Sequence, residues 1–340
     1  APQIYAAGPL LDGQALPWYG DLPLVLSSPE DANRELPKLR NAGIDFFKVY
    51  DGLSADTYQA ILAYGREHNV PVAGHVPKSV TYKTAAMSGQ RTFEHLSPFS
   101  FGDCLTDPSD WFDRGIATKY GGSYDVYYSH IEDLFAALDR QTCHEVYEAM
   151  SANGTYFAPT LVMELNDRSR VPAADIAIIS PDFRDWCDSV LDSIDDADSE
   201  RRERVYRQFS DTLLMMKDAG IRLLAGSAMP NNCIVPGFSL HWELERLVEA
   251  GVSPLEALQA ATINAAAAMD RDDEIGQLRP GFAADIVLLN ANPLDQISNT
   301  RTINGIMLNG RWIDEPERAE IFNTVKARID SMRVKEQSDQ

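Results

Sequence analysis

Short apolar runs that alternate with stretches of helical periodicity restrict the fold of this chain more than any other feature. A strand followed by a helix, repeated along a chain, is typical of a parallel sheet covered by helices. Ser54 begins one expected helix, and Ser253 with Pro254 and Glu256 has the pattern of another helix start. The chain has 340 residues, 44% of them hydrophobic, which suits a large α/β barrel or two domains. The six expected strands are residues 3–9, 45–50, 70–76, 91–96, 155–161 and 221–227.

The spacing of these strands also predicts a domain organisation. Residues 1–269 are expected to form the barrel. Residues 97–150 and 162–218 are interpreted as insertions at its active end, where they would form substrate pocket walls or an oligomer interface. Residues 270–315 contain short β runs joined by Gly, Pro and Asn turns, which predict a small β domain. Residues 316–340 are expected to form a charged terminal helix.

Composition excludes some classes of partner and leaves the compartment open. Acidic residues outnumber basic ones by 51 to 30, a formal charge of −21, and no basic stripe is present, so a nucleic-acid partner is excluded. No apolar run approaches the roughly 20 residues of a membrane span. The chain is expected to be cytoplasmic or, if a leader has been removed, periplasmic or secreted. Four cysteines without a CxxC pair suggest neither a zinc knuckle nor a redox motif, and whether any two are bridged stays open: Cys104, Cys143, Cys187 and Cys233.

Three possible metal ligands come at the ends of successive expected strands. Lys48 lies in an apolar strand, and His75 and His95 close the next two. Because the carboxyl ends of parallel barrel strands meet on one face, these side chains are expected to converge. A neutral lysine can react with carbon dioxide to give a carbamate, whose oxygens bind divalent metals alongside imidazole nitrogen. Each residue alone has an ordinary alternative, a lysine with an acidic partner or a hydrogen-bonded histidine, and only their joint position favours a metal site.

Six motifs follow one another along the chain: FFKVYDGLSADTY, PVAGHVP, TFEHLS, LLAGSAMP, GVSPLEALQAATINAAAAM and IGQLRPGFAADIVLLNANPL. Together they resemble the amidohydrolase superfamily, in the branch related to imidazolonepropionase and to prolidase-like dipeptidases and carboxypeptidases. The resemblance implies a metal-dependent hydrolase on a (β/α)8 TIM-type barrel, with a small β-sandwich built from both chain ends. It further implies that Lys48 is a carboxylated lysine bridging two zinc ions, and that His75 and His95 bind the second ion.

The chain departs from this family pattern at two places. Ala228, in LLAGSAMP, stands where the family has an aspartate that binds metal and acts as general base. The family begins with an HxH pair on its first strand, but no HxH occurs in this sequence, which is interpreted as starting at the family's third strand. One metal ion or none is therefore expected. An engineered substitution, a natural loss in a pseudoenzyme and an unexplained difference all account for Ala228, and loss of function on an ancestral hydrolase site is favoured.

The expected function is hydrolysis of an amide or peptide bond in a small molecule, with activity impaired or lost because of Ala228. A dipeptide, an N-acyl amino acid and an amide toxin such as ochratoxin all fit as substrates. The alternative is a catalytically silent barrel that acts as a binding or assembly protein. Tyr50 points the same way as Lys48 by strand alternation and is a candidate for contacting substrate, while His241 has either a pocket role or a structural capping role. A homo-oligomer is expected.

Overall fold

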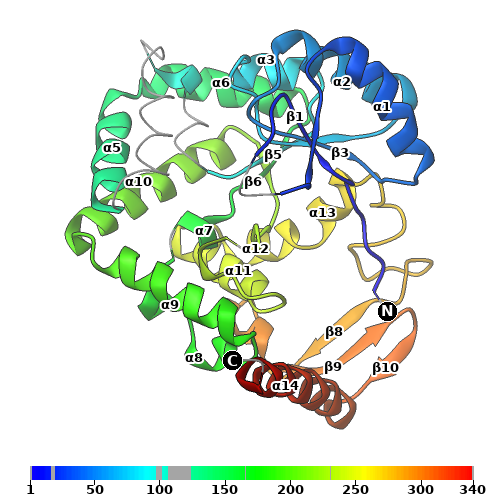
Figure 1. Ribbon diagram of the computed structural model, residues 1–340, viewed down its shortest axis with the longest axis vertical. Helices are drawn as coiled ribbons and strands as arrows, with labels where there is room; N and C mark the ends of the chain where they lie inside the picture. Colours follow the sequence, from blue (N-terminus) through cyan, green and yellow to red (C-terminus); the bar gives the residue numbers. More distant parts are fainter. Residues whose placement is uncertain are drawn as a thin grey trace.

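The computed structural model describes residues 2–16, 20–96, 102–105, 124–164, 166–229 and 231–338 (Figure 1). Its main element is a sheet of seven strands in the order β2-β1-β3-β4-β5-β6-β7, in which all neighbouring strands are parallel. The strands are β1 (Leu10–Asp12), β2 (Pro23–Val25), β3 (Phe47–Val49), β4 (Val72–Gly74), β5 (Thr92–Glu94), β6 (Tyr156–Ala158) and β7 (Arg222–Leu223).

Five of the six expected strands are confirmed, since β3 to β7 lie inside the expected runs from residue 45 onward. The expected strand at 3–9 is wrong, because the first strand begins only at Leu10. Gly8 has a φ of +73° and Pro9 has no backbone N–H, so the chain cannot pair continuously there. The backbone of Ala6 instead bonds to Asp45, through Ala6 N to Asp45 Oδ2 at 2.8 Å and Asp45 N to Ala6 O at 2.9 Å.

The sheet is open in the part of the chain that the structure describes. β2 and β7 stand at its two ends, and no pairing between them is present among the described residues. The structure therefore shows a parallel α/β arrangement, and closure of the (β/α)8 barrel that the family resemblance implies is not shown.

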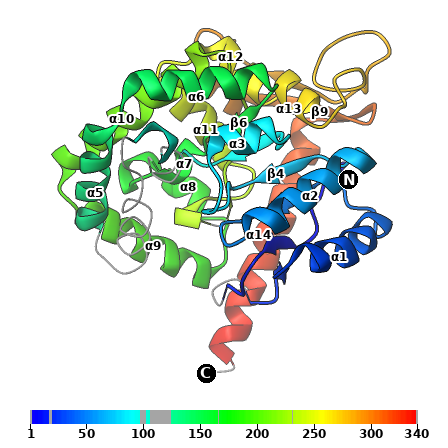
Figure 2. The ribbon, with the colours of Figure 1, turned by 90° about the horizontal axis from the view of Figure 1, so that it is seen from above.

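Helices surround this sheet, as the alternating pattern predicts (Figures 1 and 2). The two start signals named above are confirmed: Ser54 Oγ accepts from Thr57 N at 3.2 Å, and Ser253 forms a capping box with Glu256. The helices are α1 (Pro29–Asn41), α2 (Ala55–His68), α3 (Tyr82–Met87), α5 (Tyr124–Ala137), α6 (Arg140–Ala152), α7 (Leu161–Glu164), α8 (Ala173–Ile176), α9 (Pro181–Asp195), α10 (Ser199–Asp218), α11 (Ser239–Glu249), α12 (Pro254–Ala260), α13 (Ile263–Ala268) and α14 (Glu315–Ser338), with 3-10 helices η3 (Arg168–Arg170), η4 (Asn231–Cys233) and η5 (Ile297–Arg301).

The main core lies between the sheet and these helices. Phe47, the first residue of β3, and Phe93 and Phe157, the central residues of β5 and β6, are completely buried. Phe93 and Phe157 are direct neighbours across two strands. Because side chains alternate along a strand, burying Phe47 and Val49 on the core side sends Lys48 to the opposite face of β3.

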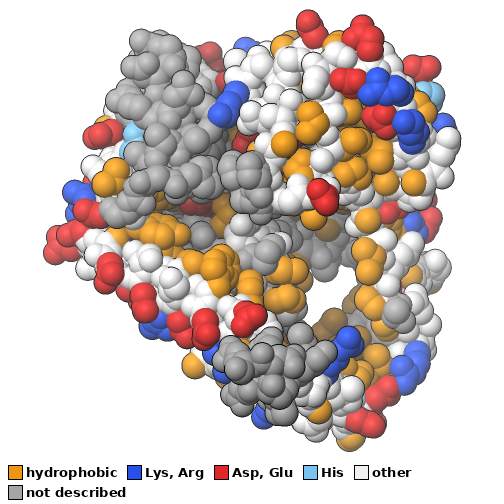
Figure 3. Space-filling model, in the orientation of Figure 1, with side chains coloured by type: hydrophobic (Ala, Val, Ile, Leu, Met, Phe, Trp, Pro, Cys, Tyr) orange, Lys and Arg blue, Asp and Glu red, His pale blue; other side chains and the backbone are white. Residues whose placement is uncertain are grey.

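The C-terminal part forms a separate small sheet. Its three antiparallel strands are β8 (Ile286–Leu289), β9 (Ile303–Leu308) and β10 (Arg311–Ile313), in the order β10-β9-β8. The predicted sandwich is thus a single antiparallel sheet among the described residues. Helix α14 lies beside β9 and extends away from the rest of the molecule (Figure 2). Figure 3 shows an opening between this part and the main body of the protein. No helix in the described part of the chain has the length and apolarity needed to cross a bilayer.

All four cysteines are paired in two disulfides, a question that their spacing left open. Cys104 bonds to Cys143, and Cys187 bonds to Cys233. The second bond joins α9 to η4, just beyond the exit of β7. The expected insertions at 97–150 and 162–218 end with α6 and α10, which return the chain to β6 and β7. Their role as pocket walls or interface, like the domain boundaries, stays a prediction.

Candidate metal-binding and catalytic site

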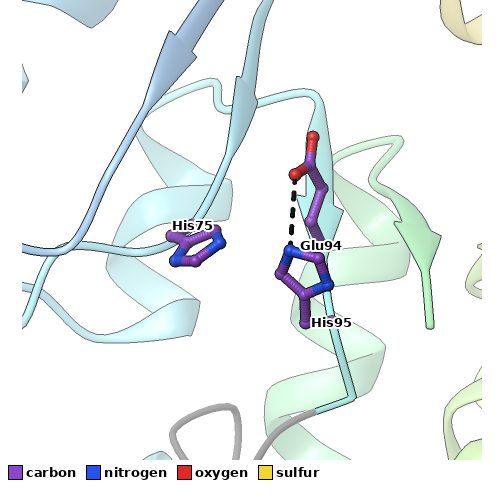
Figure 4. Close-up of side chains that lie close together, drawn as sticks. All are labelled: His75, Glu94 and His95. Atoms are coloured by element: carbon purple, nitrogen blue, oxygen red, sulfur yellow. Dashed lines mark ion pairs between the residues drawn. The ribbon is translucent and has the colours of Figure 1, made fainter. Parts of the chain in front are cut away.

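The strand ends bring His75 and His95 together. His75 follows β4 directly and His95 follows β5, and these strands are parallel neighbours. The two imidazole rings have centroids 4.9 Å apart and meet edge to face at 85° (Figure 4). Parallel packing of short strands thus places two side chains that are 20 residues apart in sequence at one edge of the sheet.

Glu94 is the residue that the sequence analysis missed. Its carboxylate lies 3.8 Å from His95 Nε2, measured from Oε2, and the possible ligand atoms of His75, Glu94 and His95 all lie within 4.8 Å of one another. Adjacent residues of a regular strand point to opposite faces, which argues against pairing Glu94 with His95. His95 has a φ of +66°, however, and this left-handed residue ends the alternation. The adjacent glutamate and histidine in TFEHLS were the only hint in that motif that Glu94 could join His95.

Lys48 joins the cluster through Glu94. Its Nζ donates to Glu94 Oε2, the same oxygen that faces His95 Nε2, and the Lys48 and Glu94 side chains are 25% and 17% exposed. This ion pair is the ordinary alternative considered for a strand lysine. The structure therefore places an acidic partner beside Lys48, and its carboxylation stays a prediction.

Both imidazoles are held through Nδ1. His75 Nδ1 lies 2.8 Å from Asp51 Oδ1, and His95 Nδ1 lies 2.8 Å from Thr160 Oγ1. Metal-binding histidines commonly use one ring nitrogen for such a partner, which sets the ring orientation. With Nδ1 engaged in this way, Nε2 is the nitrogen through which each ring would bind a metal.

Three consecutive strand exits contain a non-glycine residue in the left-handed region. These residues are His95 after β5, Thr160 after β6 and Ala228 after β7, with φ of +66°, +49° and +53°. Such conformations are unfavourable for residues with a Cβ and tend to occur at functional sites, where the surrounding structure holds them. Ala228 has no polar side-chain atom, and it packs against an apolar cluster that includes Val162 and Trp242.

The two candidate substrate contacts have different surroundings. Tyr50 is 9% exposed and stacks on His75, with ring centroids 4.0 Å apart. His241 lies on α11, where its Nδ1 is 3.0 Å from Thr300 Oγ1, and burial followed by the nearby Arg301 lowers its pKa. This bond links α11 to η5, so the contact that His241 makes is a structural one. A role of either residue in binding substrate stays a prediction.

The model of the Amidohydrolase family matches residues 51–313, most of the chain. Together with the parallel sheet and the histidines at its strand ends, this match shows that the chain belongs to the amidohydrolase family. The resemblance inferred from the motifs is confirmed.

Curated relatives match only over short stretches. Adenine deaminase from Gluconobacter oxydans is 41% identical over 81 residues, which cover 23% of this chain and 14% of that protein. Ochratoxinase from Aspergillus niger is 44% identical over 64 residues, which cover 18% of this chain and 13% of that protein. Because the matched stretches span so little of these proteins, their activities do not transfer directly.

Solved structures match over almost the whole chain, but at low identity. Bottromycin amidohydrolase has a TM-score of 0.74 at 21% identity, covering 95% of this chain and 67% of that one. A putative prolidase from Bifidobacterium longum has a TM-score of 0.59 at 21% identity, covering 95% and 69%. At this level of identity the likeness establishes the fold.

Proposed function

We propose that this chain is a metal-dependent amidohydrolase that acts on an amide or peptide bond of a small substrate, of the dipeptide or N-acyl amino acid type. The observation that carries the proposal is the meeting of His75, Glu94 and His95 at the ends of neighbouring strands, with ligand atoms within 4.8 Å of one another. A peptide-like substrate is supported by structural likeness to a protein described as a putative prolidase.

The donor set suits a divalent ion such as zinc. Two imidazoles and one carboxylate are common zinc ligands, and a carbamate on Lys48 would add oxygen ligands. When bound, such an ion supplies polarisation of the amide carbonyl and lowers the pKa of a water molecule. In the ion-paired arrangement, Lys48 already balances the charge of Glu94, so carbamate formation would place two anions side by side. We therefore propose that carboxylation of Lys48 accompanies metal binding and does not precede it.

The protein residues would orient the groups of the site. Asp51 and Thr160 hold the two imidazoles, and the Tyr50 ring covers one face of His75. Ala228 can neither bind a metal nor accept a proton, so hydrolysis is proposed to be impaired or lost. This same alanine favours the second candidate function, a catalytically silent protein that binds a small ligand without turning it over.

Metal stoichiometry and turnover test the proposal. We expect about one zinc ion per chain, lost in His95→Ala and retained in His144→Ala, a variant of a half-exposed histidine on helix α6. A panel of dipeptides and N-acyl amino acids should show weak turnover or none. Binding of a panel member without turnover would favour the silent protein. A chain that holds no zinc and neither binds nor cleaves any panel member would refute both candidates.

A further inference from the structure

A buried acid from a distant helix contacts the turn that holds His95. Glu243 lies on α11 and is completely buried. Its carboxylate accepts hydrogen bonds from two successive backbone N–H groups, Leu161 N at 3.1 Å and Val162 N at 2.7 Å. These are the first two residues of α7. Glu243 therefore caps the start of a helix that follows β6 in the chain.

Helix α7 needs this external cap because its own cap residue is used elsewhere. The residue before a helix commonly accepts from the first free N–H groups with a Ser, Thr, Asp or Asn side chain. Thr160 stands at this position, but its Oγ1 is bonded to His95 Nδ1. Thr160 also has a φ of +49°, in which a threonine is strained. Glu243 thus satisfies the N–H groups that Thr160 leaves unpaired.

The burial of Glu243 is unfavourable for its charge. Burial raises the pKa of this carboxyl to about 8, against the opposing effects of the two N–H groups and of Arg246. The hydrogen bond from Arg246 goes to Glu249 and not to Glu243. An apolar side chain would fill this position without that electrostatic penalty, but it could not accept the two N–H bonds at the turn.

We propose that Glu243 is a positioning residue for His95: by capping α7 it holds the strained Thr160 turn, and the turn orients the imidazole. The effect of Glu243 on metal binding rests on the proposed function, whereas its effect on the orientation of His95 does not. Loss of the cap would let Thr160 relax toward an ordinary conformation. The Thr160 hydroxyl would then leave His95 Nδ1, and the ring would sample more than one orientation.

The test follows the nitrogen signals of His95 by NMR in the metal-free protein. At a pH of about 9, above the raised pKa of Glu243, wild type should show one narrow set of ring signals. Glu243→Gln should shift and broaden them, because the amide keeps only one of the two carboxylate oxygens that accept from Leu161 N and Val162 N. Thr160→Val removes the hydroxyl and should give the same change. In the Thr160→Val background, Glu243→Gln should cause no further change. Glu67→Gln, an exposed helical glutamate on α2, is the matched control and should leave His95 unchanged.

Zinc affinity gives the second readout. Mutation of a direct partner of a metal-binding histidine, as Thr160 is of His95, typically lowers affinity by about 10-fold to 100-fold. Glu243→Gln acts through Thr160 and should weaken zinc binding by up to about this amount. Glu243→Asp shortens the side chain while keeping the carboxyl group, and it provides a second variant, with a smaller expected loss, if Glu243→Gln fails to fold. Unchanged His95 signals in either folded Glu243 variant, beside altered signals in Thr160→Val, would overturn the inference. If wild type bound no zinc, the proposed function would fail, and the His95 signals would still decide the role of Glu243.

Discussion

The buried carboxyl of Glu243 gives a quantitative prediction about stability and pH. Its pKa is raised to about 8 in the folded protein, mainly by burial, from an ordinary value of 4.5. Between these two pH values the folded chain holds a proton that the unfolded chain has lost. Stability from this group is therefore fully present below pH 4.5 and is lost as the pH rises to about 8. One pH unit corresponds to about 1.4 kcal/mol, which gives a total of about 5 kcal/mol.

The comparison with Glu243→Gln isolates this effect, because glutamine does not titrate. Urea unfolding of both proteins at pH values from about 5 to about 9 gives the difference in free energy of unfolding at each pH. We expect wild type to lose about 4 kcal/mol relative to the variant over this range, because a part of the total is already lost at pH 5. Trp242, the neighbour of Glu243 on α11, is 1% exposed and should report unfolding by its fluorescence.

A matched control separates Glu243 from the other carboxylates of the chain. Glu67→Gln replaces an exposed glutamate, and its difference from wild type should stay nearly constant with pH. If the Glu243→Gln difference were equally constant, within about 1 kcal/mol, the carboxyl would not be protonated on folding. The reasoning from burial to pKa would then be refuted.

Three further predictions concern other parts of the molecule. When the protein is denatured without reductant, it should show no free thiols, and four thiols per chain would contradict both disulfides. Replacing Cys187 and Cys233 by serine should lower the free energy of unfolding by about 2–4 kcal/mol. With zinc and ¹³C-labelled bicarbonate, a carbamate NMR signal should appear in wild type and in Lys217→Ala, but not in Lys48→Ala. Lys217 is a suitable control because it is 26% exposed and also has an acidic partner. A signal that persists in Lys48→Ala would exclude Lys48 as its source. Ala228→Asp should restore little amide hydrolysis, because the HxH ligands are absent from this sequence, and turnover of a dipeptide at ordinary enzyme rates would contradict this.

Strand positions could be predicted where burial alone sets the pattern. β3 to β7 lie within apolar runs because each strand buries residues such as Phe47 or Phe157 against the core. β1 was misplaced because Gly8 and Pro9 interrupt an apolar run, and only the backbone conformation shows which side of them pairs. β2 was not predicted because it has three residues, starts with proline and is partly exposed.

The candidate site was predictable only in part, for the same physical reason. His75 and His95 follow strands, and the parallel geometry brings strand ends together whatever the intervening sequence is. Glu94 depends on a local departure from strand alternation at His95, which residue types do not encode. Glu243 lies in the segment ELERLVE, whose charges suggest a solvated helix face, and its burial appears only when α11 packs beside α7. The disulfides depend likewise on the approach of residues about 40 positions apart.

The conformation of Ala228 bears on how this alanine arose. A left-handed residue with a Cβ is unfavourable by about 1–2 kcal/mol; glycine adopts it routinely, and asparagine and aspartate adopt it occasionally. Alanine has no side-chain hydrogen bond to offset this, and the Ala228 carbonyl instead accepts from the backbone N and the Nδ2 of Asn231, at 3.2 and 3.0 Å. The backbone at this exit thus suits a short polar side chain better than the one present. We propose from this mismatch that alanine replaced an aspartate at position 228.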